Sequence, residues 1–299
     1  MKGDSATLAL PEVSARRYSK TRIRILRAVL AIPRYLIALL IAAVMMLPFA
    51  WMLGTSFKPI EETIRFPPTF LPEHPVGLAN YIQVINTIPF LGYLANSVTV
   101  SVTNTVGALF TSALAGYIFA KFKFKGRDTL FFLIVSTMMV PFQVILVPVF
   151  LIVRSLNLYD SLWALIIPGL VSAWGIFLMR QSMKSLPSEL LDAARIDGAS
   201  EIGIFLQIVL PLSTPTLSAL GIFTFMATWN DFLWPLIVIS KVTSRTLPLG
   251  LATFSQGFGI SRWNLVMAGT MLSILPILIV FVLLQRNFIE GITMGAVKG

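Results

Sequence analysis

Long apolar segments, nearly free of charged residues, divide the chain into a small number of elements. A helix that crosses a membrane needs about 20 largely apolar residues. By this criterion the pattern predicts six spanning helices, at about residues 35–57, 90–120, 129–153, 160–180, 208–240 and 263–286. Loop-forming Pro75, Gly77, Asn80 and Pro89 precede the second helix, which is therefore expected to begin only near Phe90. The predicted fold is an all-α integral membrane protein, because the segments are too long for barrel strands.

The positions of lysine and arginine predict the orientation of these helices. An even number of spans places both termini on one face. If that face is cytoplasmic, 17 of the 23 lysine and arginine residues lie inside and 6 lie outside, as the positive-inside rule requires. Residues 1–34 then form a basic cytoplasmic tail that can also touch anionic lipid, 35–288 the six-span domain, and 289–299 a cytoplasmic C-terminal tail.

Composition narrows the function further. The chain is 56% hydrophobic and 12% charged, has no cysteine, and contains one histidine, His74. Thiol chemistry is excluded, and His74 has no second imidazole with which to complete a metal site. The net charge of +10 lies beside apolar segments, which points to a lipid bilayer and not to nucleic acid. We therefore expect neither a metal centre nor an enzyme.

The predicted cytoplasmic segment between spans four and five breaks the basic pattern, because residues 180–207 carry a net charge of −1. Ser188 is a good N-cap and Glu189 suits a first helical turn, while Leu190, Leu191 and Ala194 recur at helical spacing. Gly198 then predicts the helix end, and Ser200 predicts the cap of a second helix. The pattern indicates a helix, a glycine corner and a second helix, which by itself is compatible with an ordinary helical hairpin.

The same segment resembles the coupling loop of ABC importer permeases. The similarity lies in the run from Asp192 to Ala199, followed by Phe205, Ile208 and Leu210-Pro211; the family usually has glutamate in place of Asp192. The resemblance implies that this loop docks on an ATP-binding subunit. The residues implied in coupling are Glu189, Leu190, Asp192, Ala193, Ala194, Asp197, Gly198, Ala199 and Phe205.

The resemblance extends over most of the chain. Ser56-Phe57-Lys58-Pro59, Asn80-Tyr81, Asn96-Ser97 and the C-terminal residues are similar to the smaller, six-span permease of the maltose-transporter type. This implies a second homologous permease, two ATP-binding subunits that hold ATP and Mg²⁺, and an extracytoplasmic solute-binding protein docking on the outer segments. It also implies a bacterial or archaeal plasma membrane, a sugar-like solute, and a contact of Gly295, Ala296, Val297 and Lys298 with the ATPase. Chemistry alone predicts that this glycine-rich tail is frayed.

One charged residue, Asp231, interrupts a predicted span, within Trp229-Asn230-Asp231-Phe232-Leu233-Trp234-Pro235. Asn230 and Asp231 can bind hydroxyl groups, and Trp229 or Trp234 can offer a ring face to a sugar, so these four residues form a candidate pathway or gate. The alternative is structural: the tryptophans belong to an interfacial belt, and Asp231 binds backbone freed by Pro235. Likewise Asn104, Pro141, Gln143 and Pro148 either line a pathway or allow bending.

These observations predict a permease subunit of a binding-protein-dependent ABC importer that works by alternating access. The chain binds no cofactor of its own, because it lacks a phosphate-binding Gly-x-x-x-x-Gly-Lys-Ser/Thr sequence. The alternative is a stand-alone secondary carrier or channel. That function requires ion-coupling residues within the spans, for which Asp231 is the only candidate.

Overall fold

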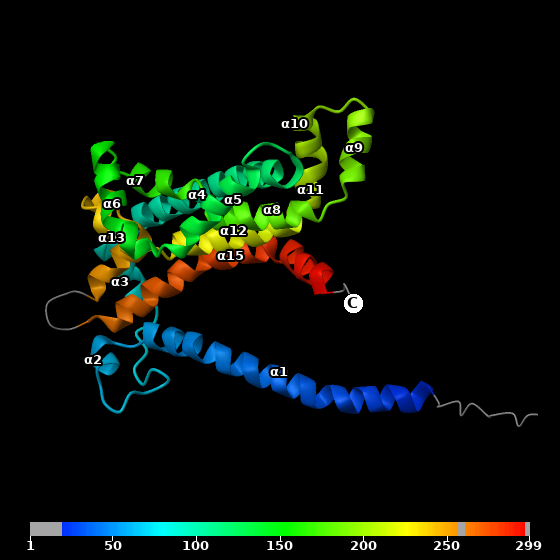
Figure 1. Cartoon of the computed structure of the whole chain (residues 1–299). Coiled ribbons are helices and arrows are strands. Elements are labelled where there is room, and N and C mark those ends of the chain that lie inside the picture. The colour runs from blue at the N-terminus through cyan, green and yellow to red at the C-terminus, as the bar shows by residue number, and fades with distance from the viewer. Residues whose placement is uncertain (1–19, 256–260, 297–299) are drawn as a thin grey trace, which may run out of the picture. The chain divides into compact units, whose positions relative to one another are not determined.

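All regular elements within the described residues, 20–255 and 261–296 of the computed structural model, are helical (Figure 1). The chain divides into two units, Met1–Trp51 and Met52–Gly299. In the first unit, α1 (Lys20–Ser56) exposes every residue from 32 to 50. A helix that is apolar all round, with a mean hydropathy of 2.5 over Ala31–Ser56, is suited to lipid or to a partner helix.

The second unit contains the remaining helices. In chain order they are α2 (Ile60–Thr63), α3 (Ala79–Thr87), α4 (Phe90–Lys121), α5 (Arg127–Ser136), η1 (Thr137–Met139), α6 (Phe142–Ser155), α7 (Trp163–Ile166), η2 (Ile167–Gly169), α8 (Ala173–Lys184), α9 (Ser188–Ile196), α10 (Glu201–Ile204), the π-helical turn η3 (Phe205–Val209), α11 (Leu210–Leu212), α12 (Thr214–Trp229), α13 (Leu233–Val238), η4 (Val242–Ser244), α14 (Leu247–Leu251), η5 (Ala252–Phe254) and α15 (Trp263–Ala296).

The centre of this unit is formed by α4, α8, α12 and α15. Helix α4 packs on α8 and α12, and α12 packs on α15. The approach of α4 to α8 depends on Gly116, where an added Cβ would lie 2.6 Å from the Cβ of Met179 and 2.9 Å from the backbone nitrogen of Arg180. Small residues permit such close contacts between membrane helices.

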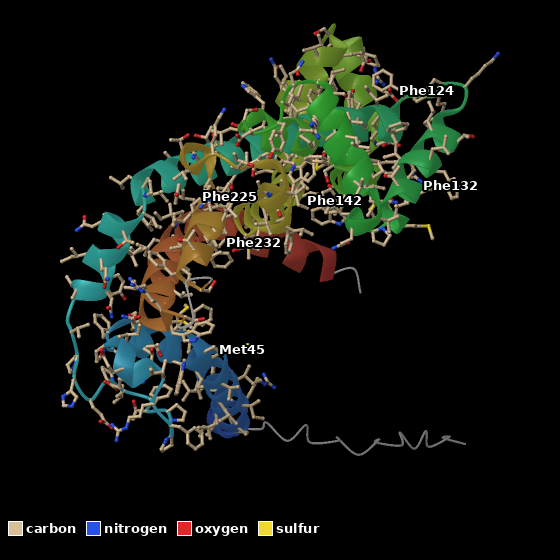
Figure 2. All side chains as sticks on the ribbon, turned by 90° about the vertical axis from the view of Figure 1, so that its left-hand side faces the viewer. Met45, Phe124, Phe132, Phe142, Phe225 and Phe232 are labelled. Atoms are coloured by element: carbon tan, nitrogen blue, oxygen red, sulfur yellow. The ribbon has the colours of Figure 1, made fainter. Side chains whose placement is uncertain are left out.

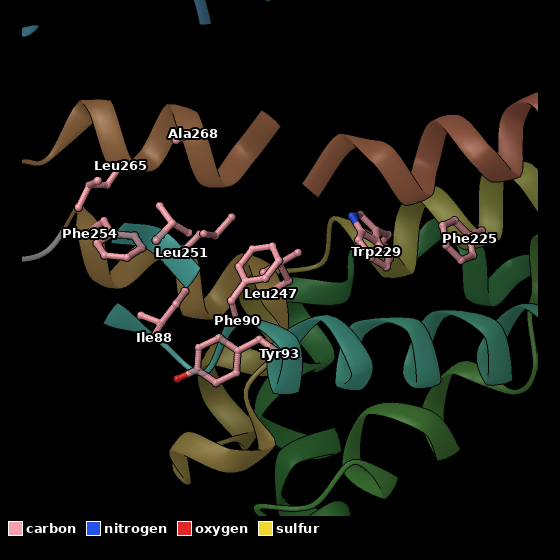
Figure 3. Close-up of a cluster of buried hydrophobic side chains, with 11 residues drawn as sticks. Ile88, Phe90, Tyr93, Phe225, Trp229, Leu247, Leu251, Phe254, Leu265 and Ala268 are labelled. Carbon is pink, nitrogen blue, oxygen red and sulfur yellow. The ribbon is translucent and has the colours of Figure 1, made fainter. Parts of the chain in front are cut away.

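Buried apolar side chains form clusters at separate positions along these helices. One cluster joins Phe90 and Tyr93 of α4 to Phe225 and Trp229 of α12 and to Leu265 of α15 (Figure 3). A second cluster lies around α7 and α13, and a third lies where α4 and α8 meet α9 and η3. The third cluster supports the helical hairpin described below.

The membrane-spanning pattern is confirmed only in part. Among residues 20–255 and 261–296, four helical segments have the length and hydropathy to cross a membrane, and two bent pairs raise the number to 6 if each pair is one span. The segments predicted as spans at 129–153 and 208–240 are each a bent pair of helices, with a bend of 104° before α6 and of 75° before α12. Pro141 lies at the first bend and Pro215 just after the second, where neither ring interrupts a helix interior.

The expected start near Phe90 is confirmed, but the expected loop before it contains α3. Asn80 in α3 is buried because its amide donates to the carbonyl oxygens of Ser56 and Lys58, both at 2.8 Å, and its Oδ1 accepts from Asn264 at 2.9 Å. These bonds fasten the segment after α1 to α3 and to the start of α15. A residue expected to mark a loop is therefore a buried anchor.

The segment between α2 and α3 also has a buried charged group. The carboxylate of Glu62 accepts hydrogen bonds from the backbone nitrogens of Glu73 and His74 and from the Thr69 hydroxyl, and lies 4.0 Å from the Lys58 ammonium. Burial raises the pKa of Glu62, but these hydrogen bonds outweigh burial and leave the pKa below its ordinary value. Glu62 therefore orders this segment as a carboxylate.

Candidate functional site

Residues 188–204 form a hairpin of α9 and α10, hereafter the hairpin. Gly198 has φ +85°, so the expected glycine corner is confirmed. The expected cap at Ser200 is also confirmed, because its hydroxyl accepts from the Gly203 nitrogen at 3.1 Å. The expected cap at Ser188 is wrong: Pro187 occupies the capping position, with φ −58° and ψ 129°, and Ser188 is the first helical residue.

Apolar contacts fix the hairpin to the helix bundle. Leu191 of α9 is 1% exposed and packs with Met183 of α8 and with Ile204 and Phe205. Phe205 also packs against Tyr117 of α4, with ring centroids 5.4 Å apart. Leu190, expected on the same apolar face, is instead 43% exposed. The hairpin is therefore packed on the ends of α4 and α8 as part of the same body.

A polar network joins the two arms of the hairpin to α4. Arg195 donates to Asp192 at 2.6 Å and to Glu201 at 2.7 Å, and Glu201 accepts from the Tyr117 hydroxyl at 3.0 Å. The hydrogen bonds from Arg195 to Glu201 and then to Asp192 raise the pKa of Arg195 above its ordinary value. Sequence reasoning missed the network. The opposite charges of Arg195 and Glu201, one on each side of the Gly198 corner, could have predicted their ion pair. Nothing in the sequence predicts the contact with Tyr117, because Tyr117 is distant along the chain.

The surface of the hairpin that does not contact the bundle is open and contains small, apolar and acidic residues. Ile196 is 86% exposed and Ile202 is 72% exposed. Seven of the nine residues implied in coupling are exposed with them, whereas Ala194 is half-buried and Phe205 is buried; the exposed ones are Glu189, Leu190, Asp192, Ala193, Asp197, Gly198 and Ala199. Ile196 lies one turn beyond Asp192 and Ala193, so helical periodicity could have predicted its exposure.

The hairpin lies at one end of the helix bundle, opposite the end that carries α3, α6 and α13 (Figure 1). The last turn of α15, which contains Gly295 and Ala296, lies toward the hairpin end. Helix α15 therefore continues to Ala296, in a segment that was expected to be frayed from its glycine content alone. The remaining implied contacts, Val297 and Lys298, lie outside the described residues.

The tryptophans of the candidate gate are buried by protein contacts. Trp229 is 1% exposed and donates to the Ser273 hydroxyl at 3.3 Å; Trp234 is 5% exposed and donates to the Ala164 carbonyl at 3.0 Å. Asp231 accepts from the Trp234 nitrogen at 3.3 Å, as the structural alternative expects, and Asn230 donates to the Met226 carbonyl at 2.8 Å. In this conformation neither indole offers an open ring face.

Two adjoining hollows, hereafter the trough, lie beside this region and share Gly169, Ala227 and Thr228. The first has a volume of about 410 Å³ and the second about 540 Å³. The first is also lined by Val100, Asn104, Phe142, Gln143, Leu165, Pro168, Asp231, Leu233, Trp234, Pro235 and Thr246, and the second by Val171, Ser172, Trp174, Phe223 and Thr224. Within residues 20–255 and 261–296, no group of three or more acidic or histidine side chains could hold a metal ion.

Comparison with known proteins assigns the family of this chain. The model of the family described as "binding-protein-dependent transport system inner membrane component" matches residues 112–293. The arabinooligosaccharides transport system permease protein AraQ of Halalkalibacterium halodurans is 38% identical over 87% of this chain and 93% of its own length. The sn-glycerol-3-phosphate transport system permease protein UgpE of Pectobacterium atrosepticum is 40% identical over 69% of this chain and 74% of its own.

A solved structure agrees with this assignment at the level of the fold. The crystal structure of a bacterial ABC transporter involved in the import of the acidic polysaccharide alginate has a chain that superimposes with a TM-score of 0.73 at 24% identity, covering 91% of this chain and 99% of that one. The chain therefore belongs to the family of inner-membrane components of binding-protein-dependent transport systems, the permeases of ABC importers.

Proposed function

We propose that this chain forms half of the translocation pathway for a sugar or sugar-like solute and couples it to ATP hydrolysis on separate subunits. The observation that carries this proposal is the hairpin, which is packed firmly on α4 and α8 while exposing small and apolar residues on its other face. An exposed apolar surface on a rigid support is typical of an interaction site. The partners are a second permease, two ATP-binding subunits holding ATP and Mg²⁺, and an extracytoplasmic solute-binding protein.

The mechanism is alternating access. ATP-driven closure of the ATP-binding subunits moves the hairpins of the two permeases together, and the helices packed on them follow because Leu191 and the hydrogen bond from Tyr117 to Glu201 connect hairpin and bundle. The pathway then opens outward to receive solute from the binding protein, which docks on the outer segments. Hydrolysis restores the inward-facing state.

The proposal is tested by assembling the complete importer in liposomes. With ATP on the side of the membrane that carries the ATP-binding subunits and loaded binding protein on the other side, solute transport is expected, and it is expected to stop without ATP. Transport by this chain alone, driven by a proton or sodium gradient, would show that it is a secondary carrier. A thermal-shift screen of the cognate binding protein against neutral sugars, polyols and glycerol phosphates identifies the solute to use.

The proposed topology has six spans, with each bent pair counted as one span, both termini in the cytoplasm, and domain limits at 1–34, 35–288 and 289–299. Because the chain has no cysteine, the labelling of single introduced cysteines can test this topology. A membrane-impermeant thiol reagent is expected to label Thr69→Cys from outside the cell and to label Gly126→Cys only after the membrane is opened. Thr69 precedes α3, whereas Gly126 precedes α5. The reverse labelling pattern would contradict the orientation.

The ion pair across the hairpin predicts a specific loss of partner binding. Arg195→Glu places a negative charge beside Asp192 and Glu201 and is expected to reduce the ATP-binding subunit that co-purifies by several-fold, because like charges separate the two arms. Adding Glu201→Arg is expected to restore part of that loss. Arg65→Glu removes the 2.6 Å pair with Glu73 far from the hairpin and should leave co-purification unchanged. If Arg195→Glu and Arg65→Glu reduced the co-purified ATP-binding subunit equally, this would argue against a role of the hairpin.

A further inference from the structure

The helices around the trough are interrupted at three places, and each interruption borders the trough. The first is the break before α6, where Phe142 is labelled in Figure 2; the second is the turn η2 with the residues that follow it; the third is the break between α12 and α13 at Asp231. Non-helical backbone within a membrane protein is tolerated where it is buried in protein or lines a hydrated cavity. Three such breaks around one space favour a hydrated cavity.

The side chains that line the trough combine aromatic surfaces with hydrogen-bonding groups. Phe142 is 39% exposed, Trp174 37% and Phe223 50%, and the last two rings meet edge to face at 5.9 Å. Hydroxyl, amide and carboxyl groups lie among these rings, contributed by Asn104, Gln143, Ser172, Thr224, Thr228, Asp231 and Thr246. The oxygens Asn104 Oδ1 and Thr246 Oγ1 are buried and have no hydrogen-bond partner. Pockets of mixed aromatic and polar lining are typical of small-molecule sites.

We propose that the trough contacts the passing solute, that this solute is a neutral sugar, and that phosphorylated or carboxylated solutes are disfavoured there. This inference rests on the proposed function as an importer permease, and it adds a solute class and a location. The C–H face of a sugar ring is apolar and packs on exposed aromatic rings, while its hydroxyl groups pair with amides, hydroxyls and a carboxyl group. The lining offers both kinds of contact.

The charge of the lining excludes anions. Of the described residues that line the trough, none is a lysine or arginine, and the ionisable one is Asp231. A phosphate or uronate group that contacts this lining would lose part of its hydration and would meet the carboxyl group of Asp231 instead of a cation, which is unfavourable. A neutral ring with hydroxyl groups has no such penalty.

Lipid is a poor occupant of the same space. Hydrocarbon against Gln143, Thr228 and Asp231 would leave polar groups without partners. The remaining alternative is that side chains of the second permease fill the trough. The experiment below distinguishes this case from a hydrated path, because a filled trough admits no water-soluble reagent.

The test uses Thr228→Cys in the complete importer, with labelling followed on this subunit by mass. A cationic trimethylammonium methanethiosulfonate is expected to react on the order of tenfold faster than an anionic sulfonate one, after correction for their rates with a free thiol. Asp231→Asn in the same background is expected to reduce that preference. During turnover, a transported neutral probe (arabinotriose, maltose or lactose) is expected to slow labelling, and glycerol 3-phosphate and a guluronate trisaccharide are expected to be neither transported nor protective.

A second variant tests the aromatic contact. Trp174→Leu keeps an apolar side chain but removes the ring and is expected to raise the KM for uptake of the neutral probe by up to about tenfold. Trp163→Leu is the matched control, since Trp163 is 58% exposed on α7 and does not line the trough; its KM should stay unchanged.

The outcomes separate this inference from the proposed function. Three results would each overturn the inference and leave the importer function standing: transport of a neutral probe that does not protect the Thr228→Cys thiol, a thiol in that variant that reacts in no condition, or transport of an anionic probe. An assembled complex that transports neither the five probes nor any solute that the cognate binding protein binds would contradict both.

Discussion

Replacing Gly198 with proline is expected to abolish attachment of the ATP-binding subunit and solute-stimulated ATP hydrolysis. Gly198 has φ +85°, whereas proline holds φ near −65°, and its nitrogen donates to the Arg195 carbonyl at 3.1 Å, a bond that proline cannot make. The corner between α9 and α10 therefore cannot form. Because the proposed docking face consists of both arms and the corner, its shape is lost. The measurement is co-purification of the ATP-binding subunit together with hydrolysis in the presence of loaded binding protein.

The matched control is Gly126→Pro. Gly126 has φ +79°, and no atom lies within 4 Å of an added Cβ, as at Gly198. Both substitutions therefore impose the same backbone conflict, but Gly126 lies in the turn before α5 and not in the hairpin. Gly126→Pro is expected to retain the ATP-binding subunit. If Gly198→Pro kept normal coupling, or if both variants lost attachment to the same extent, the hairpin would not be the coupling element.

Local chemistry made parts of the hairpin predictable. Gly198 and Ser200 were expected at a helix end and a helix cap because their roles depend on neighbouring backbone groups only. Ser188 was wrongly expected to cap α9, because residue type favours serine as a cap, whereas the helix begins one residue earlier and leaves Pro187 in the capping position. The sequence could not show which of Leu190 and Leu191 is buried, because this depends on the cluster that Leu191 forms with Met183 and Ile204.

Features that depend on distant segments were not predictable from the pattern. Bending at Pro141, before α6, was one of two alternatives, but the bend before α12 was missed, because hydropathy measures the length of an apolar segment and not its straightness. Asn104 and Gln143 were recognised as polar residues within spans, but nothing in the sequence places them beside Thr228 and Asp231 around one trough. That placement results from α4, the start of α6 and the break after α12 meeting around one space.

The contact of α4 with α8 leads to the last prediction: Gly116→Ala is expected to destabilise the protein by about 1–3 kcal/mol, the range found for overpacked cores. The new methyl group would lie 2.6 Å from the Cβ of Met179 and 2.9 Å from the backbone nitrogen of Arg180. Neither atom can rotate away, so α4 and α8 must move apart. The readout is the midpoint of thermal unfolding in one detergent at one protein concentration.

Gly92→Ala on the same helix is the control, because its nearest neighbour is the Cβ of Pro89 at 3.9 Å, an ordinary contact. Alanine favours helix over glycine by up to about 1 kcal/mol, so Gly92→Ala is expected to be neutral or stabilising. The two variants have the same chemical change and differ only in whether the helix face is packed. A Gly116→Ala protein as stable as Gly92→Ala would show that α4 and α8 do not approach as closely as described. Because Tyr117 of α4 and Met183 of α8 carry the hairpin, loosening this contact should also weaken ATPase attachment.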